Sequence, residues 1–249
     1  MECHLHGVAS RQGGRPPLIA LDDVVRVGRE LGMRRLSINA VAARLGVSAT
    51  ALYRHVDGRW DLERLVGESL LAELELRDDP NADTERHLLS FGVQLRDFTT
   101  AHPGLASYLE VLFPRGDSGA RLLAAEVEAL SRRGYSADAA MVLSSAVATL
   151  AIGLAAREES REESREESNA NPTGGGEATG FAAERDAVAG RLVGDPQLGA
   201  AHAGLAQLSS SRFLRLLLAA SIRGLVAVIP PGRAIDDVLA ELDGAGEGR

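Results

Sequence analysis

The sequence contains no lysine, so all 27 of its basic residues are arginine. We interpret this bias as a property of the coding sequence and not of the function. Aromatic residues are scarce as well, at 4% of the chain, which argues against a fold built from β-strands, where aromatic side chains are favoured. The apolar 45% consists mostly of Ala, Leu and Val, and Ala and Leu are strong helix formers. We therefore expect an all-α protein.

The chain has a single cysteine, Cys3, which excludes an internal disulfide framework and fits a reducing compartment. The first residues lack the apolar core of a signal peptide, so the sequence predicts a cytoplasmic protein. Cys3, His4 and His6 are compatible with metal binding, but their Gly- and Pro-flanked position is more typical of a disordered tail. We predict neither a metal nor a cofactor.

Positive charge is concentrated at one end of an acidic chain. The net charge is -8, yet residues 1–60 carry nine arginines against five acidic residues, and the remainder carries 18 against 30. Such asymmetry predicts a local anion-binding surface on an acidic body. The acidic total does not argue against nucleic-acid binding, because phosphate contacts respond to charges within about 8 Å at physiological salt.

Capping residues and apolar spacing predict four helices in the first third of the chain. Ser37 and Ser48 are favoured at helix starts, and Gly32 and Gly46 stand where helices are expected to stop. After a flexible tail at 1–17, the helices are expected over about 18–31, 37–45, 48–56 and 60–76.

The charged stretch 77–83 breaks this pattern. We divide the chain into a head at 18–62 and a helical body at 63–243, with the fourth helix bridging the two. An insert at 157–180 contains the sequence REES three times. The repeat places like charges four residues apart, so we expect a weak helix that frays into a disordered loop. Further helices are expected over 84–101, 104–112, 118–133, 137–159, 210–229 and about 234–242.

Residues 139–156 form an uncharged run of 18, near the lower limit for a transmembrane helix. The run contains Ser144, Ser145 and Thr149 and lacks an aromatic belt or a flanking basic cluster. A helix buried inside a bundle explains this composition better than a membrane span does. We predict no membrane association.

The segment 37–56 has the spacing of a helix-turn-helix, in which two short helices are joined by a tight turn containing glycine. The outer face of the second helix would then enter the major groove of DNA, where the start of such a helix meets base edges. Thr50 and Arg54 are suited to hydrogen bonds with bases, and Ala49 to a thymine methyl group. The small core between the helices is expected to contain Ala42, Leu45, Val47, Leu52 and Val56.

An alternative is that Tyr53 and His55 are only packing residues of a three-helix bundle. The caps, the glycine, the spacing and the local positive charge together favour a DNA-binding surface over that interpretation. On this surface, Tyr53, His55, Arg44 and Arg59 would reach phosphates, which set affinity and register but read no sequence.

The stretch LSINAVAARLGVSATALYRHVDGRWDLERLV resembles the N-terminal domain of TetR family transcriptional regulators. The resemblance covers about residues 18–70, and its specific features are LGVS at 45–48, LYRH at 52–55 and a basic residue at 59. It implies an N-terminal three-helix helix-turn-helix domain followed by a larger helical domain for ligand binding and dimerisation. Asp57 departs from the family pattern, because an acid would weaken a nearby phosphate contact. The residues that the resemblance places at DNA are Ser37, Asn39, Arg44, Ser48, Thr50, Tyr53, Arg54, His55 and Arg59.

A single helix-turn-helix makes few contacts, so we expect a homodimer on a palindromic DNA operator. The dense apolar helices at about 137–156 and 210–229 are the expected interface, as a four-helix bundle, with wholly internal helices as the alternative. The resemblance also implies repression that is released when a small, mostly hydrophobic effector binds in the body. Polar groups in the aliphatic interior are the candidate ligand contacts: Gln94, His102, Tyr108, Ser144, Ser145 and Thr149.

Two other functions remain open at this stage. An effector-independent architectural DNA-binding dimer would have a sealed body, whereas a regulator needs a cavity on the order of several hundred cubic ångströms. An enzyme fused to a helix-turn-helix would need a catalytic motif, and the sequence has no nucleophile elbow, phosphate-binding glycine loop or paired metal ligands. His87, His102 and His202 are far apart in the sequence and lack partners at ligand spacing. We therefore predict that the protein is not an enzyme.

Overall fold

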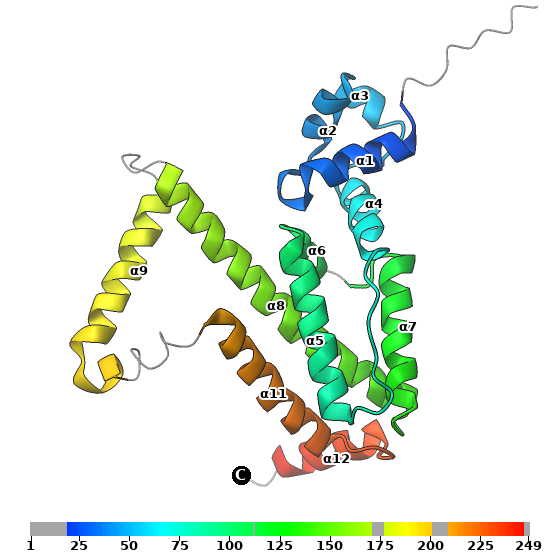
Figure 1. Cartoon of the computed structure of the whole chain (residues 1–249), viewed down its shortest axis with the longest axis vertical. Helices are drawn as coiled ribbons and strands as arrows, with labels where there is room; N and C mark the ends of the chain where they lie inside the picture. The colour runs from blue at the N-terminus through cyan, green and yellow to red at the C-terminus, as the bar shows by residue number, and fades with distance from the viewer. Residues whose placement is uncertain (1–18, 112, 171–176, 201–208, 247–249) are drawn as a thin grey trace, which may run out of the picture.

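A computed structural model describes residues 19–111, 113–170, 177–200 and 209–246, and these residues form helices and no strand (Figure 1). The all-α fold class, with a small N-terminal head and a larger helical body, is thus confirmed. The tail at 1–17, with Cys3, His4 and His6, lies outside the described residues, as does His202. The elements are α1 (Leu21–Leu31), the 3-10 turn η1 (Met33–Arg35), α2 (Ile38–Leu45), α3 (Ala49–Leu52), α4 (Arg59–Leu71), α5 (Thr84–Ala101), α6 (Leu105–Val111), α7 (Asp117–Ser131), α8 (Ala137–Ala170), α9 (Glu177–Gly194), α11 (Ser210–Val228) and α12 (Ile235–Gly246).

The predicted caps of the head are confirmed. The Ser37 hydroxyl accepts the backbone N–H of Ala40 at 3.1 Å and so closes the start of α2. The Ser48 hydroxyl accepts the N–H of Ala51 at 3.2 Å at the start of α3. Gly46 ends α2 at φ +70°, a conformation that glycine adopts without the steric penalty of a Cβ atom.

Two predicted helix ends were placed too late. The third helix was expected to reach Val56, but α3 ends at Leu52 and residues 53–55 form a turn. The fourth helix was expected to reach about Leu76, whereas α4 ends at Leu71. Leu74 is nevertheless buried, so the apolar spacing that suggested a longer helix reflects core packing of a non-helical segment.

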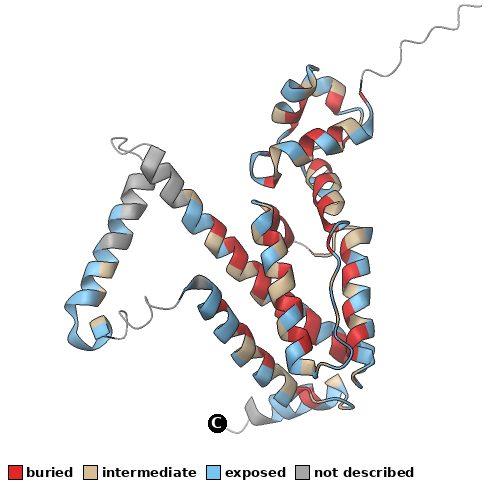
Figure 2. Cartoon of the chain, in the orientation of Figure 1, coloured by how far each residue is buried: buried red, intermediate tan, exposed pale blue. Residues whose placement is uncertain are grey.

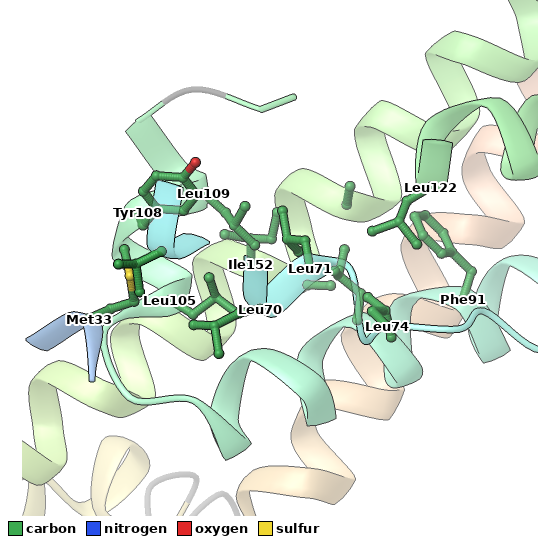
Figure 3. Close-up of a cluster of buried hydrophobic side chains, with 14 of the residues drawn as sticks. Met33, Leu70, Leu71, Leu74, Phe91, Leu105, Tyr108, Leu109, Leu122 and Ile152 are labelled. Atoms are coloured by element: carbon green, nitrogen blue, oxygen red, sulfur yellow. The ribbon is translucent and has the colours of Figure 1, made fainter. Parts of the chain in front are cut away.

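Helix α4 joins the head to the body, as predicted (Figure 1). Against the head, Val66 lies so close to Gly28 of α1 that an added Cβ atom would come within 2.4 Å of its Cγ2. Toward the body, Leu70 and Leu71 are buried among side chains of other helices such as Leu105 and Leu109 (Figure 3). One continuous cluster of buried apolar residues therefore runs from the head into the body, and the division at residue 62 stays a prediction.

The apolar segment at 139–156 lies in α8, at the centre of the body. Its helix is long and apolar enough to cross a membrane, but 56% of the most apolar window is buried inside the protein (Figure 2). Leu143, Val147 and Ala151 are fully buried against the surrounding helices. Packing in the core accounts for this hydrophobicity, in agreement with the prediction of a helix buried in a bundle.

The REES repeats form a helical extension, as expected, but residues 169–170 and 177–180, which were expected to lie in a disordered loop, are helical as well. Helix α8 continues through the REES repeats to Ala170, and α9 begins at Glu177 and returns from the far end of α8 (Figure 1). Tertiary contacts support the extension, because Glu158 pairs with Arg96 of α5 and Glu163 lies 2.7 Å from Arg34 of η1. Sequence spacing within one helix contains no information on such contacts. Residues 171–176 lie outside the described residues.

A buried polar cluster ties the loop after α4 to α5 and α7. His87 of α5 places Nδ1 2.9 Å from Asp78 Oδ1 and Nε2 3.0 Å from Glu126 Oε2. Arg133 donates to Asp78 at 2.6 Å, and hydrogen bonds from Arg133 and then Arg132 lower the pKa of the Asp78 carboxyl to about 2 against the opposing effect of burial. The cluster holds the loop against the body where α4 ends.

Candidate nucleic-acid interface and cavities

The outer face of α3 is open to solvent. Leu52 of α3 is buried, as is Val56 just beyond it, whereas Thr50, Tyr53 and Arg54 are exposed, Tyr53 at 56% of its surface. Successive residues of a helix point about 100° apart, so the same short segment both anchors itself in the head and projects these side chains outward. An exposed tyrosine beside an arginine on a capped helix is suited to contact nucleic acid.

The other residues predicted at DNA lie on the same small domain. Ala49 and His55 are half-buried, and the remainder are exposed: Ser37, Asn39, Arg44, Ser48 and Arg59. Of the predicted core, Ala42, Leu52 and Val56 are buried, while Leu45 and Val47 are half-buried. No predicted contact residue is enclosed by the head's own side chains.

Three of these residues already have partners within the chain, namely Arg59 and the helix-capping Ser37 and Ser48. Arg59 Nε donates to Glu63 Oε1 at 2.6 Å across one turn of α4. The Arg59 side chain is 76% exposed, and surface ion pairs of this kind contribute only about 0–1 kcal/mol, so a phosphate can compete for the guanidinium. The Ser48 oxygen caps α3, which leaves its hydroxyl hydrogen as the donor available to an external acceptor.

A narrow apolar cavity of about 40 Å³ lies in the body between α5, α7 and α8. Phe91, Leu95 and Leu122 line it, and the buried Ser144 hydroxyl in its wall has no hydrogen-bond partner among the described residues. A groove of about 270 Å³ along α6 and α8 adjoins it and shares Phe113, Ser145 and Ala148 with it. The two spaces together form a mostly apolar site with a few hydroxyl groups, which suits a hydrophobic ligand.

Three of the six predicted ligand contacts gather at this site. Ser144 and Ser145 line the cavity, and Ser145 and Thr149 line the groove. The sequence analysis missed Phe113 and Glu110, which contribute an aromatic face and a carboxylate. The loop that carries Phe113 has no periodic pattern that would reveal its direction.

The other three predicted contacts lie elsewhere. Gln94 uses its amide to hold the backbone of Arg77, accepting from its N–H at 2.8 Å and donating to its carbonyl at 3.0 Å. His102 is half-buried against Phe98, with Nδ1 2.8 Å from the Phe98 carbonyl oxygen. Tyr108 lines a different pocket at the junction of head and body. Gln94 and His102 are thus satisfied structural polar groups, which sequence alone does not distinguish from ligand contacts.

Helices α8 and α11 also leave apolar side chains uncovered. On α11, Leu218 and Ile222 are buried, whereas Leu216 on another side is 58% exposed and Val228 is exposed as well. On α8, Met141 and Val142 are exposed near its start. Single exposed apolar side chains are common on protein surfaces, so these positions are compatible with a partner surface but do not define one.

Comparison with known proteins gives one curated relative, an HTH-type transcriptional regulator of Saccharopolyspora erythraea, 26% identical over 152 residues. The match covers 59% of this chain and 64% of the relative, so the chain spans a little under two thirds of the relative's length. No family model matches the chain.

Solved structures give a broader match. Apo ActR of Streptomyces coelicolor, a TetR family protein, aligns with a TM-score of 0.64 at 22% identity, over 86% of this chain and 99% of ActR. Its complex with actinorhodin aligns with a TM-score of 0.66 at 23% identity over the same shares. TetR of Acinetobacter baumannii aligns with a TM-score of 0.57 at 17% identity, over 83% and 96% of the two chains. The chain has the fold of TetR family proteins, which confirms the resemblance found in the sequence.

Proposed function

We propose that the protein is a DNA-binding transcriptional regulator that binds a palindromic operator as a homodimer, represses transcription, and is released by a small, mostly hydrophobic effector. The observation that carries the proposal is the presentation of α3, which exposes Thr50, Tyr53 and Arg54 at the tip of a head with the TetR fold. Thr50 and Arg54 read bases, while Tyr53, His55, Arg44 and Arg59 contact phosphates.

The proposed dimer forms through α8 and α11. A single head offers one short recognition helix, and specific DNA-binding domains of this kind gain affinity by placing two such helices in successive major grooves. The uncovered apolar side chains of both helices, including Met141, Val142, Leu216 and Val228, support this assignment. Burial of apolar surface stabilises an interface by roughly 25 cal/mol per Å².

The proposed effector occupies the cavity and groove between α5, α6, α7 and α8. The buried Ser144 hydroxyl supports this, because a ligand acceptor or donor would satisfy a group that has no hydrogen-bond partner in the described part of the chain. The fold likeness to ActR, whose structures include complexes with actinorhodin and (S)-DNPA, supports a ligand-responsive body. The effector would favour a pre-existing arrangement of the dimer in which α4 holds the heads at the wrong separation for the operator.

Selection of bound duplexes from random DNA tests the core of the proposal. We expect the selected sequences to converge on a palindrome with half-sites one or more helical turns apart. Arg54→Ala should reduce the preference at one base position per half-site by about 1–3 kcal/mol, whereas His55→Ala should weaken all duplexes to a similar extent.

Arg86→Ala, on an exposed part of α5 in the body, serves as the control and should leave both the selected sequence and the affinity unchanged. Recovery of unrelated sequences from wild-type protein, or an unchanged preference with Arg54→Ala, would contradict the assignment of α3 as the reading helix.

A substitution that fills the cavity tests whether the effector binds there. A library of hydrophobic small molecules is screened for compounds that release the wild-type protein from its selected operator in a gel-shift titration. Ser144→Leu places a larger apolar side chain in the cavity and should make release by such a compound at least tenfold less sensitive, while DNA affinity without compound stays the same.

The narrowness of the cavity favours a second candidate, an effector-independent architectural dimer. That function is supported instead if no compound in a broad library weakens DNA binding. Ser131→Leu, on the exposed end of α7, is the matched control for the substitution and should respond to a releasing compound as the wild type does.

A further inference from the structure

A pocket of about 330 Å³ lies at the junction of head and body, apart from the cavity proposed for the effector. Its wall combines η1 and the first turn of α4 with α6, the loop before α7 and the REES part of α8. Backbone contact brings the two sides together, since the Arg34 N–H of η1 donates to the Pro103 carbonyl just before α6 at 3.3 Å. The pocket is therefore built by tertiary packing of segments far apart in the sequence.

Arg115 is the central charged group of this pocket. Its side chain is only 8% exposed, and its guanidinium carbon lies 4.4 Å from the ring centroid of Tyr108 and 5.0 Å from that of Trp60. Its Nη1 has no hydrogen-bond partner among the described residues, and the nearest carboxylate oxygen, on Glu63, is 3.8 Å away. A buried charged donor without an acceptor is unfavourable, so an external acceptor at this position would be stabilised.

Tyr108 provides a second donor without a partner. Its side chain is buried and its ring lies on Gly67 of α4, where an added Cβ atom would come within 2.5 Å of the ring. The hydroxyl group points away from the neighbouring Leu105 and Met33 (Figure 3) and has no hydrogen-bond partner among the described residues. Burial raises the pKa of this hydroxyl, so it is a neutral O–H donor at physiological pH.

The charges that line the pocket leave one positive charge in excess. Arg34 is 2.7 Å from Glu163, and Arg59 is 2.6 Å from Glu63. Arg115 is the third arginine of the lining, and the two glutamates are the acidic residues among the described residues that line it. Glu63 lies closer to Arg59 than to Arg115, at 2.6 Å and 3.8 Å, so it is shared between the two arginines.

Exposed apolar surface lies beside these donors. Trp60 and Val111 both line the pocket, and each is 62% exposed although large apolar side chains are usually covered. An aromatic or aliphatic body placed here would cover both side chains. The volume is at the lower end of the range for small-molecule sites and accommodates a compact ligand.

We propose that the junction pocket binds a small organic carboxylate, whose oxygens accept hydrogen bonds from Arg115 Nη1 and the Tyr108 hydroxyl and whose compact apolar body lies against Trp60 and Val111. This site adjoins the groove proposed for the effector, since Val111 lines both, but its donors Arg115 and Tyr108 do not line that groove. The proposal does not depend on the proposed function in DNA binding. A ligand held between α4 and the body would also couple reciprocally to any movement of the head.

The fluorescence of Trp60 reports directly on the pocket, because it is the only tryptophan of the chain. The full-length protein without DNA is titrated with cyclohexanecarboxylate and phenylacetate, and with the neutral amides of the same two acids as charge controls. We expect a saturable change in tryptophan emission for at least one acid in the micromolar to millimolar range, and at least tenfold weaker binding of its amide.

Two variants separate binding from folding. Arg115→Gln should weaken binding of the acid at least tenfold, and Tyr108→Phe, which removes only the hydroxyl oxygen and keeps the ring, should weaken it severalfold without loss of helical circular dichroism. Arg86→Gln, an exposed arginine of α5 outside the pocket, should bind as the wild type does.

Three outcomes would overturn the proposal. The first is no saturable change in emission with either acid up to about 10 mM, roughly the weakest fragment affinity that such a pocket would have. The second is equal binding of an acid and its amide. The third is an unchanged dissociation constant in folded Tyr108→Phe. None of these outcomes bears on operator selection, so failure here and failure of DNA binding are distinguishable.

Discussion

Replacing His87 with leucine is expected to lower the free energy of unfolding by about 3–5 kcal/mol. His87 is buried between two carboxylates, and among the described residues its Nε2 atom provides the only side-chain hydrogen bond to the buried Glu126. Both ring nitrogens donate at once only when the ring carries two protons. Leucine has a similar size but no donor, so the variant leaves Glu126 enclosed without its partner. Equilibrium denaturation in urea or guanidinium chloride measures the loss.

A double-mutant cycle tests the physical reason for this loss. If the uncompensated carboxylate dominates, His87→Leu combined with Glu126→Leu should recover a large part of the stability, since replacement of a buried polar pair by apolar residues is often close to neutral. His102→Leu is the control, because that histidine is half-buried and its Nδ1 contacts only the Phe98 carbonyl. A loss below about 1 kcal/mol in His87→Leu would show that the cluster contributes little.

Gly104→Ala is expected to lower the free energy of unfolding by about 2–4 kcal/mol and to loosen the contact between head and body. Gly104 has φ +89°, and an added Cβ atom would lie 2.4 Å from the backbone nitrogen of Arg34 and 2.8 Å from the carbonyl carbon of Met33. Backbone atoms cannot rotate away as a side chain can, so η1 itself must move. Denaturation measures the stability, and hydrogen exchange at the Arg34 amide reports whether its bond to Pro103 is weakened.

Gly134→Ala separates the cost of a side chain at positive φ from the cost of the steric contact with η1. Gly134 has nearly the same φ, +91°, but an added Cβ atom would meet only the Pro231 side chain at 3.4 Å, an ordinary contact. This variant should therefore lose only the cost of the backbone conformation, about 1–2 kcal/mol. Equal losses in the two variants, or unchanged exchange at Arg34 in Gly104→Ala, would contradict a steric junction between head and body.

The head was predictable because its signals are local. A capping serine, a left-handed glycine and apolar residues three or four apart act within one or two turns, so Ser37 and Gly46 mark the two ends of α2 and Ser48 marks the start of α3 in the sequence itself. The exposure of Arg54 and the burial of Leu52 follow from the same spacing. The predicted contacts of these side chains with DNA stay predictions until the operator is selected.

The ligand contacts were less predictable because a polar residue in an apolar helix has two explanations. Ser144 and Gln94 are both polar residues in apolar helices. The Ser144 hydroxyl lines a cavity and has no hydrogen-bond partner that the structure describes, whereas the Gln94 amide holds the backbone of Arg77 through two hydrogen bonds. Which explanation applies depends on the residues opposite, and these come from distant segments. The REES repeat is a similar case. Its charge spacing does not favour a helix, but its glutamates pair with Arg34 and Arg96, which come from distant segments.

The sequence by itself determined that the chain is helical, where α2 begins and ends, where α3 begins, and which side chains of α3 and the turn after it point outward, because capping and side-chain direction depend on near neighbours. Only the tertiary structure decided that His87 lies between Asp78 and Glu126, that Gly104 contacts the backbone of Arg34, and that Arg115 lies between two aromatic rings. Several of those contacts join residues tens of positions apart, such as His87 with Glu126 and Gly104 with Arg34, and their geometry is set by how whole helices pack.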